Sequence, residues 1–180
     1  MSEIDILKEI TIRLTQNNID YMLSGSVSMN FYTTPRMTRD IDIVILIGIN
    51  DIDKIVSIFN KDYYIDKDMV INAVTNQSMF NIIHLQEVIK VDFIVRRNEE
   101  YRILEFKNRK KVILDGVEIS IVSLEDLIIS KIFWSKESNS ENQIRDIKNL
   151  IKIKYDMDYV ELWCKKLNVF DHYERILNDK

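Results

Sequence analysis

Two aspartates stand at the start of a long apolar run. Only Ile41 separates Asp40 from Asp42, and positions 43–47 hold nothing but isoleucine, valine and leucine. Because side chains alternate across a strand with a period of two, a strand over 40–47 projects both carboxylates from one face. A carboxylate beside a buried strand is costly unless it is paired or bound to a cation. The pattern predicts a buried sheet strand that begins at an acidic site able to hold a divalent metal.

A third acid and a glycine-serine pair extend this site. Asp92 falls inside the apolar segment 89–95, which is typical of a strand, and Gly25-Ser26 follows a short expected strand over 20–24. A glycine lets the backbone approach a phosphate, while the serine hydroxyl and the first amides of the next helix are donors to an anion. Carboxylates on adjacent strands suit Mg²⁺. The sequence therefore predicts a two-metal site beside a phosphate-binding turn.

Apolar periodicity places the remaining elements. Asp115-Gly116 suits a tight hairpin turn, Ser123 followed by Asp126 marks the start of a helix, and the polar segment 135–143 is expected to be a loop between helices. Expected strands cover 20–24, 40–47, 79–85, 89–95, 111–114 and 117–122, and expected helices cover 2–16 with Ser2 as N-cap, 27–32, 51–60 and most of the chain from 123 onward. We expect an α/β half over 1–122 and a helical half over 123–180.

Composition excludes several classes of protein. A length of 180 residues with 46% hydrophobic content suits one domain with a small appended subdomain. A net charge of -4 excludes a basic nucleic-acid coat, so any contact with nucleic acid must be local. The single Cys164 cannot form an internal disulfide, and no apolar run is long enough to cross a membrane. A cytoplasmic protein is expected.

The ordered motifs resemble the polymerase beta-like nucleotidyltransferase superfamily, and more narrowly its small AbiEii-like and MNT-type bacterial members. They are Gly25-Ser26, Arg36-x-Thr38-x-Asp40-Ile41-Asp42, and Asp92 in a hairpin. The resemblance implies an α+β fold in which a nucleotidyltransferase core with a mixed β-sheet flanked by helices precedes a C-terminal helical subdomain that completes the cleft. It covers about residues 18–152.

The same resemblance implies a role for each matching residue. Two Mg²⁺ ions, with Mn²⁺ as the alternative, would be held by Asp40, Asp42 and Asp92. Lys131 and Asp146 match a lysine and an acid on successive helices of the AbiEii-like group, although Asn149 stands where a second acid is usual. The implied catalytic residues are Asp40, Asp42, Asp92 and Asp146; the implied nucleotide-binding residues are Gly25, Ser26, Arg36, Thr38, Arg39 and Lys131.

The implied reaction moves a nucleoside monophosphate from a nucleoside triphosphate such as ATP to an acceptor hydroxyl and releases pyrophosphate. The acceptor stays open between RNA such as a tRNA end, a protein side chain as in toxin-antitoxin systems, and a small molecule. The alternative is a non-catalytic module that binds nucleotide or protein. A regulatory partner of that kind would be favoured by an exposed apolar patch around Trp163 and Phe170. The oligomeric state is also open.

Each assignment has a structural alternative. Asp40 and Asp42 would instead pair with Arg36 and Arg39, and Asp92 with Lys90 or Arg96. Ser26 would be only a helix N-cap. Lys131 and Asp146 would each lie on a solvated helix face, with Arg145 as the neighbour of Asp146. A basic cluster is a candidate RNA contact or a solvated face; it comprises Arg96, Arg97, Arg102, Lys107, Arg109, Lys110 and Lys111.

Overall fold

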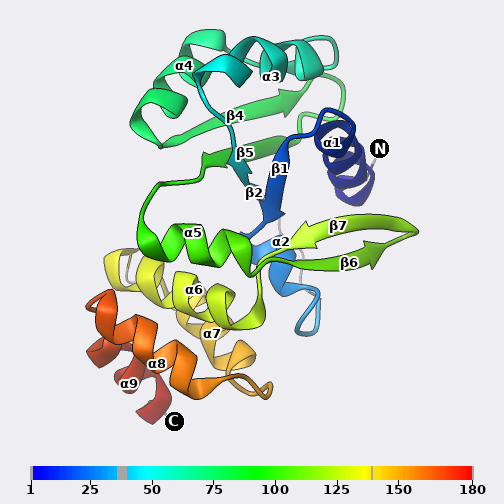
Figure 1. The fold of residues 1–180 in the computed structure, drawn as a ribbon. Coiled ribbons are helices and arrows are strands. Elements are labelled where there is room, and N and C mark those ends of the chain that lie inside the picture. Colours follow the sequence, from blue (N-terminus) through cyan, green and yellow to red (C-terminus); the bar gives the residue numbers. More distant parts are fainter. Residues whose placement is uncertain (1, 36–39, 139, 180) are drawn as a thin grey trace.

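The computed structural model describes residues 2–35, 40–138 and 140–179. Its described strands form one seven-stranded mixed sheet in the order β3-β4-β5-β2-β1-β7-β6 (Figure 1). The strands are β1 (Asp20–Leu23), β2 (Ile41–Leu46), β3 (Tyr63–Tyr64), β4 (Met79–His84), β5 (Lys90–Val95), β6 (Lys110–Leu114) and β7 (Val117–Ile121).

The centre of the sheet is the strand that follows the two aspartates. β2 pairs antiparallel with β1 and parallel with β5, and the side chains of Ile41, Ile43 and Ile45 are almost completely buried. The intervening residues Asp42 and Val44 are only partly buried, so the strand alternates as its sequence predicts. This alternation places Asp42 on the face opposite to the isoleucines.

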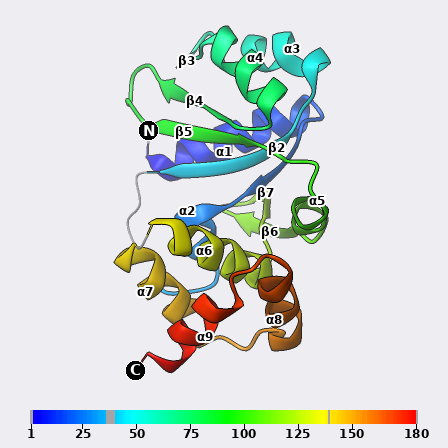
Figure 2. The same ribbon diagram turned by 90° about the vertical axis from the view of Figure 1, so that its left-hand side faces the viewer.

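Helices lie on both sides and at one end of this sheet (Figures 1 and 2). They are α1 (Glu3–Gln16), α2 (Gly25–Met29), α3 (Ile52–Phe59), α4 (Lys67–Asn76), α5 (Glu100–Lys107), α6 (Leu124–Ser138), α7 (Glu141–Leu150), α8 (Met157–Lys166) and α9 (Phe170–Asn178), with a 3₁₀ turn η1 (Ile49–Asp51) before α3. In Figure 2, α3 and α4 lie beyond β4, and α6 to α9 gather at the opposite end of the molecule.

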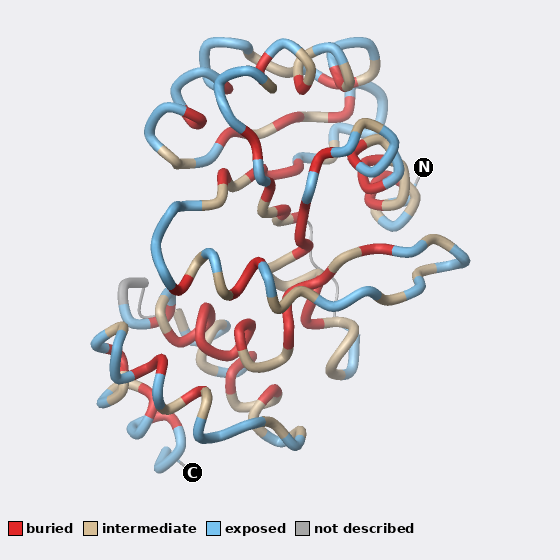
Figure 3. The backbone as a smooth tube through the Cα atoms, in the orientation of Figure 1, coloured by how far each residue is buried: buried red, intermediate tan, exposed pale blue. Residues whose placement is uncertain are grey.

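Two hydrophobic cores hold these layers together, and their buried segments are spread through Figure 3. One core lies between the sheet and α1, α3 and α4, with Ile10, Phe59 and Phe93 at 0% exposure. The second packs α6 to α9 together, but it also takes in Met22 of β1 and Tyr101 of α5. The helical half is therefore built onto the sheet through residues from the first half of the chain.

Most of the expected elements are present. Ser2 caps α1 and forms a reciprocal capping box with Asp5, and Ser123 and Asp126 make the expected bond at the start of α6, with 2.7 Å between Ser123 Oγ and Asp126 Oδ2. β6 and β7 join through Asp115 and Gly116, both at positive φ, as a tight hairpin requires. The mixed sheet flanked by helices confirms the predicted fold class.

Other parts of the prediction were wrong. Segment 135–143 is not a loop, because α6 continues to Ser138 and α7 begins at Glu141. Lys136, Glu141 and Asn142 in this segment are exposed on these helices, where a polar side chain does not oppose a helix. β3, which has two residues, and the helices α4 and α5 were not predicted. No described helix meets the length and apolarity that a membrane crossing requires.

Candidate active site

Asp42 and Asp92 lie side by side on the central strands. β2 and β5 pair in parallel with Asp42 directly opposite Asp92, so both side chains belong to the same face of the sheet. Asn81 of β4 is opposite Asp92 on its other side. Asp40 is exposed and lies just before β2 begins. The sheet thus brings together two of the predicted acids, with the third next to them along the chain.

The environment of Asp42 opposes its ionisation. Burial raises the pKa of its carboxyl to about 6, and the negative charges of Asp92 and Asp40 act in the same direction. The positive charges of Lys131 and Lys90 lower that pKa but do not restore the ordinary value. Crowded carboxylates of this kind are typical of sites that receive a cation or a proton.

Asp92 is 6% exposed and forms an ion pair with Lys90. Its Oδ2 lies 2.8 Å from Lys90 Nζ, while its Oδ1 is buried without a hydrogen-bond partner among the described residues. The hydrogen bond to Asp92 raises the pKa of Lys90. Lys90 is therefore the partner among the two structural alternatives. The Arg96 guanidinium donates instead to the side chain of Asn98. The ion pair uses one carboxylate oxygen and leaves the other buried, with no partner in the described part of the chain.

Gly25 packs directly against Asp42. It begins α2 at φ +62°, a left-handed conformation that favours glycine, and a Cβ at this position would overlap Oδ2 of Asp42 and come within 2.8 Å of its Cγ. The backbone amide of Ser24 donates to the carbonyl oxygen of Asp42 at 2.9 Å. The turn between β1 and α2 therefore lies on the acidic pair, and any side chain at position 25 would displace Asp42.

Ser26 lies in the first turn of α2 but is not its N-cap. The cap position is Ser24, whose side chain makes no capping hydrogen bond. The alternative that assigned the cap to Ser26 is thus wrong by two residues, because the helix already begins at Gly25. This position leaves Ser26 beside the Gly25–Asp42 contact.

Lys131 and Asp146 form a buried ion pair between α6 and α7. Their Nζ and Oδ2 atoms are 2.8 Å apart, and the residues are 4% and 1% exposed. Gln143 Oε1 accepts a second hydrogen bond from Lys131 at 3.1 Å, whereas Arg145 bonds to Asn142. The alternative that placed both residues on solvated faces is wrong. Because the charge of Lys131 acts on Asp42, the pair belongs to the same electrostatic environment as the acids.

The acids present fit a divalent cation by their chemistry. Asp92 offers a buried oxygen that no described residue bonds, and Asp42 sits among like charges that a cation would neutralise. Among the described residues, no three His, Cys, Asp or Glu side chains are already gathered as a set of metal ligands. The fit therefore depends on the Asp42–Asp92 pair, with Asp40 as the adjacent third acid. Arg36, Thr38 and Arg39 lie outside the described residues.

Several cations of the basic cluster are bonded within the protein. Arg102 donates to Glu105 at 2.9 Å, Arg109 to Asp20 at 2.9 Å, and Lys111 to Glu118 at 2.6 Å. Trp163 is only 5% exposed and packs against Tyr101, so the apolar patch that would favour a regulatory partner is not centred on it. Neither feature forms part of the acidic site.

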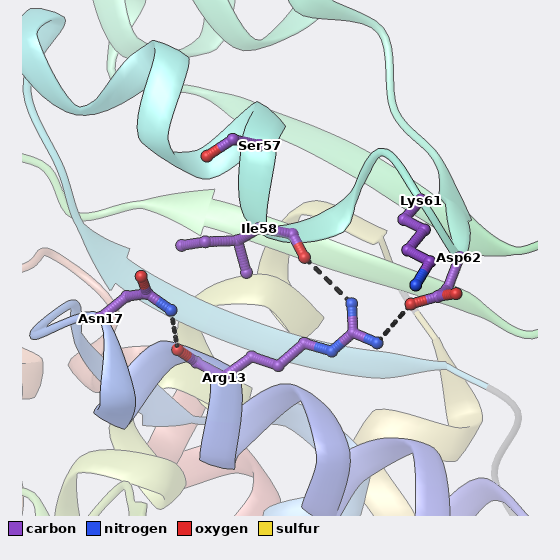
Figure 4. Close-up of a pocket in the computed structure, with 6 residues that line it drawn as sticks. All are labelled: Arg13, Asn17, Ser57, Ile58, Lys61 and Asp62. Carbon is purple, nitrogen blue, oxygen red and sulfur yellow. Dashed lines mark hydrogen bonds and ion pairs between the residues drawn. The ribbon is translucent and has the colours of Figure 1, made fainter.

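A surface hollow of about 420 Å³ lies elsewhere, beside α1 and α3 (Figure 4). Arg13 in its wall donates to the carbonyl oxygen of Ile58 at 2.9 Å and to Asp62 at 2.6 Å. Arg13 is thus already bonded within the wall, which Lys61 also lines, and the hollow contains none of the predicted site residues.

The sequence predicts only some of the polar neighbours of these acids. Asn81 is not among the predicted residues, because only the β4–β5 register places it opposite Asp92. Lys90 enters the prediction only as a structural partner of Asp92, although its spacing of two residues on a strand indicates a shared face. Gln143 was assigned to a loop. The structure therefore adds polar neighbours to an acidic core that the sequence located.

Comparison with known proteins shows that the chain is similar in structure to several solved proteins. Neither protein-family models nor curated proteins match the sequence. Among solved structures, the chain is similar to ANT(2″)-Ia in complex with adenylyl-2″-tobramycin, with a TM-score of 0.66 and 12% identity over 93% of this chain and 98% of that chain. It is also similar to the lincosamide antibiotic adenylyltransferase LnuA bound to lincomycin, with a TM-score of 0.59 and 17% identity over 86% and 99%.

A third similar structure is an antigenic nucleotidyltransferase-like protein from Paracoccidioides brasiliensis, with a TM-score of 0.60 and 17% identity over 83% of this chain and 75% of that chain. The chain has the nucleotidyltransferase fold. This fold extends through the helical half, since the matched regions cover most of both chains. The superfamily-level resemblance is thus supported at the level of fold; the AbiEii-like and MNT-type assignment stays a prediction.

Proposed function

We propose that this protein is a metal-dependent nucleotidyltransferase that moves a nucleoside monophosphate from a nucleoside triphosphate to an acceptor hydroxyl. The observation that carries the proposal is the pairing of Asp42 with Asp92 on adjacent parallel strands of this fold, next to the Gly25 turn. Two neighbouring carboxylates, one buried and one partly buried, that are only partly neutralised are costly for stability, which a purely structural role would not explain.

The reaction follows from the chemistry of the site. The acceptor oxygen forms a bond to the α-phosphorus, the bond from that phosphorus to the bridging oxygen breaks, and pyrophosphate leaves with the bonding electrons. Asp40, Asp42 and Asp92 would hold Mg²⁺, which when bound stabilises negative charge on the phosphates. Asp92 is also proposed to promote loss of the proton from the acceptor hydroxyl, which passes to solvent.

The remaining residues would bind and orient the triphosphate. The absence of a side chain at Gly25 allows the backbone to approach the phosphates, and Ser26 would donate its hydroxyl to a phosphate oxygen. Lys131 would offset charge that develops on the departing pyrophosphate. Asp146 holds the Lys131 ammonium at 2.8 Å, so its proposed role is to orient that lysine, beside the acceptor-orienting role implied by the resemblance. Arg36, Thr38 and Arg39 remain proposed phosphate contacts.

We favour a small molecule as the acceptor. Two of the similar structures contain an adenylylated aminoglycoside and a lincosamide, and both match nearly the full length of their chains. The main basic cluster, which would have held RNA, has several of its cations in ion pairs with nearby acids. RNA and protein side chains are the acceptors to be compared in the test.

The test incubates the protein with Mg²⁺ and each α-labelled triphosphate in turn. Separate reactions receive aminoglycosides and lincosamides, total RNA, or cell protein. Label transferred to a small hydroxyl compound, together with pyrophosphate release that requires Mg²⁺, is the expected result. Label in RNA or protein would replace the acceptor, and transfer to no pool would favour the non-catalytic nucleotide-binding module.

A further inference from the structure

The two carboxylate oxygens of Asp92 have different surroundings. Oδ2 lies 2.8 Å from the ammonium of Lys90, while Oδ1 is buried and has no hydrogen-bond partner among the described residues. A buried acceptor without a partner carries a desolvation penalty that a bound ligand would remove. This asymmetry marks Oδ1 as the oxygen that is available to a ligand.

Lys90 is placed to maintain this asymmetry. It lies two residues before Asp92 on β5, so both side chains project from the same face of the sheet. The Lys90 side chain is 44% exposed, whereas that of Asp92 is 9% exposed. The ammonium therefore approaches Asp92 from the solvent side, where its stem can change direction without disturbing the core.

The position of Lys90 also affects any cation that approaches the acids. Asp42 lies opposite Asp92 in the β2–β5 register, so a cation shared by these acids would sit close to the lysine ammonium. Two positive charges near one carboxylate repel each other, even though each of them is attracted to it. Lys90 therefore stabilises the acidic pair before a cation arrives and weakens the binding of that cation.

We propose that Lys90 is a positioning residue and built-in counter-ion that holds Asp92 through Oδ2 and leaves Oδ1 for the divalent cation. The proposal rests on the proposed function for the identity of the site. Its first test needs no acceptor substrate, so the proposed role of Lys90 and the proposed function can fail separately.

The first test titrates Mn²⁺ into the purified protein and follows its thermal unfolding midpoint. Lys90→Met should lower the half-saturating Mn²⁺ concentration at least threefold, because the repelling charge is gone, and Lys90→Arg should stay within twofold of wild type. Lys111→Met is the matched control, since it removes another exposed strand lysine that is paired with an acid. In an Asp92→Asn background, Lys90 loses the carboxylate that holds its ammonium beside the site, so Lys90→Met should tighten Mn²⁺ binding less than it does in the wild-type background.

The second test measures transfer of the nucleoside monophosphate. Lys90→Met should lower kcat at least tenfold and change KM for the triphosphate less than threefold, because Asp92 loses its orientation while the phosphate contacts remain. Lys90→Arg should recover most of kcat. Mn²⁺ binding that is unchanged or weaker in Lys90→Met would overturn the proposal. A wild-type protein that shows the expected Mn²⁺ pattern without any turnover would overturn the proposed function and leave the role of Lys90 supported.

Discussion

The charge of Asp42 should destabilise the folded protein at neutral pH. Burial and the neighbouring acids raise its pKa from 3.8 to about 6. A shift of about two units corresponds to about 3 kcal/mol of unfolding free energy, at about 1.4 kcal/mol per unit. Because Asp42 is only partly buried, this is an upper bound. Asp42→Asn removes the charge with little change in shape and should raise stability at pH 8 by up to that amount.

The pH dependence gives the sign of the effect. Between about pH 4 and pH 6 the folded protein keeps a proton on Asp42 that the unfolded chain releases, so this carboxyl favours folding most at low pH. That advantage is lost as the pH rises through about 6. The stability difference between Asp42→Asn and wild type should therefore be small near pH 4.5, grow through pH 6 and level off by pH 8.

Urea unfolding at pH 4.5, 6 and 8 measures this difference. Asp62→Asn is the matched control with the opposite sign, because a hydrogen bond from Arg13 lowers the pKa of Asp62 and its charge favours folding above pH 4. An Asp42→Asn variant that is no more stable than wild type at pH 8, or equally stabilised at all three pH values, would refute the reasoning.

Two further predictions concern the contacts around the acids. Gly25→Ala should lose more stability and far more nucleotide binding than Gly116→Ala. Both residues have positive φ, but only at position 25 would the new Cβ occupy the space of Asp42. Equal losses in urea unfolding and in nucleotide titration would argue against the contact. Lys131→Met should cost about 3–5 kcal/mol of unfolding free energy because it leaves the charge of Asp146 buried without its ion-pair partner. The double variant Lys131→Met with Asp146→Leu should regain much of that loss, and a double variant as unstable as Lys131→Met would contradict the explanation.

The sequence was sufficient to locate the acidic core but not its surroundings. Asp42 and Asp92 each lie within an apolar strand pattern, and a buried charge in such a pattern signals a site whatever the rest of the fold. The Lys131–Asp146 contact could not be predicted from either helix alone, because it depends on how α6 packs against α7. The Gly25-Ser26 motif predicts that the backbone at Gly25 approaches a phosphate closely. The contact between Gly25 and Asp42, in contrast, depends on the β1–β2 pairing.

Errors in the element prediction have a similar physical origin. Segment 135–143 is predicted to be a loop because it is polar, but polar residues such as Lys136 and Glu141 are equally suited to an exposed helix face. The hairpin at Asp115-Gly116 was predicted correctly because its conformation is decided by local turn chemistry alone. Local signals were reliable where the conformation is local, and tertiary packing decided the rest.

The central claim is that Asp42 and Asp92 together form the site of nucleotidyl transfer. Its most direct test compares label transfer from an α-labelled triphosphate in wild type, Asp42→Asn and Asp92→Asn, with Lys111→Met as control and with folding checked by urea unfolding. We expect Mg²⁺-dependent transfer by wild type and by Lys111→Met. The rate should be at least a thousandfold lower in both aspartate variants, although Asp42→Asn is more stable than wild type at pH 8. Full transfer by either folded aspartate variant would contradict the account.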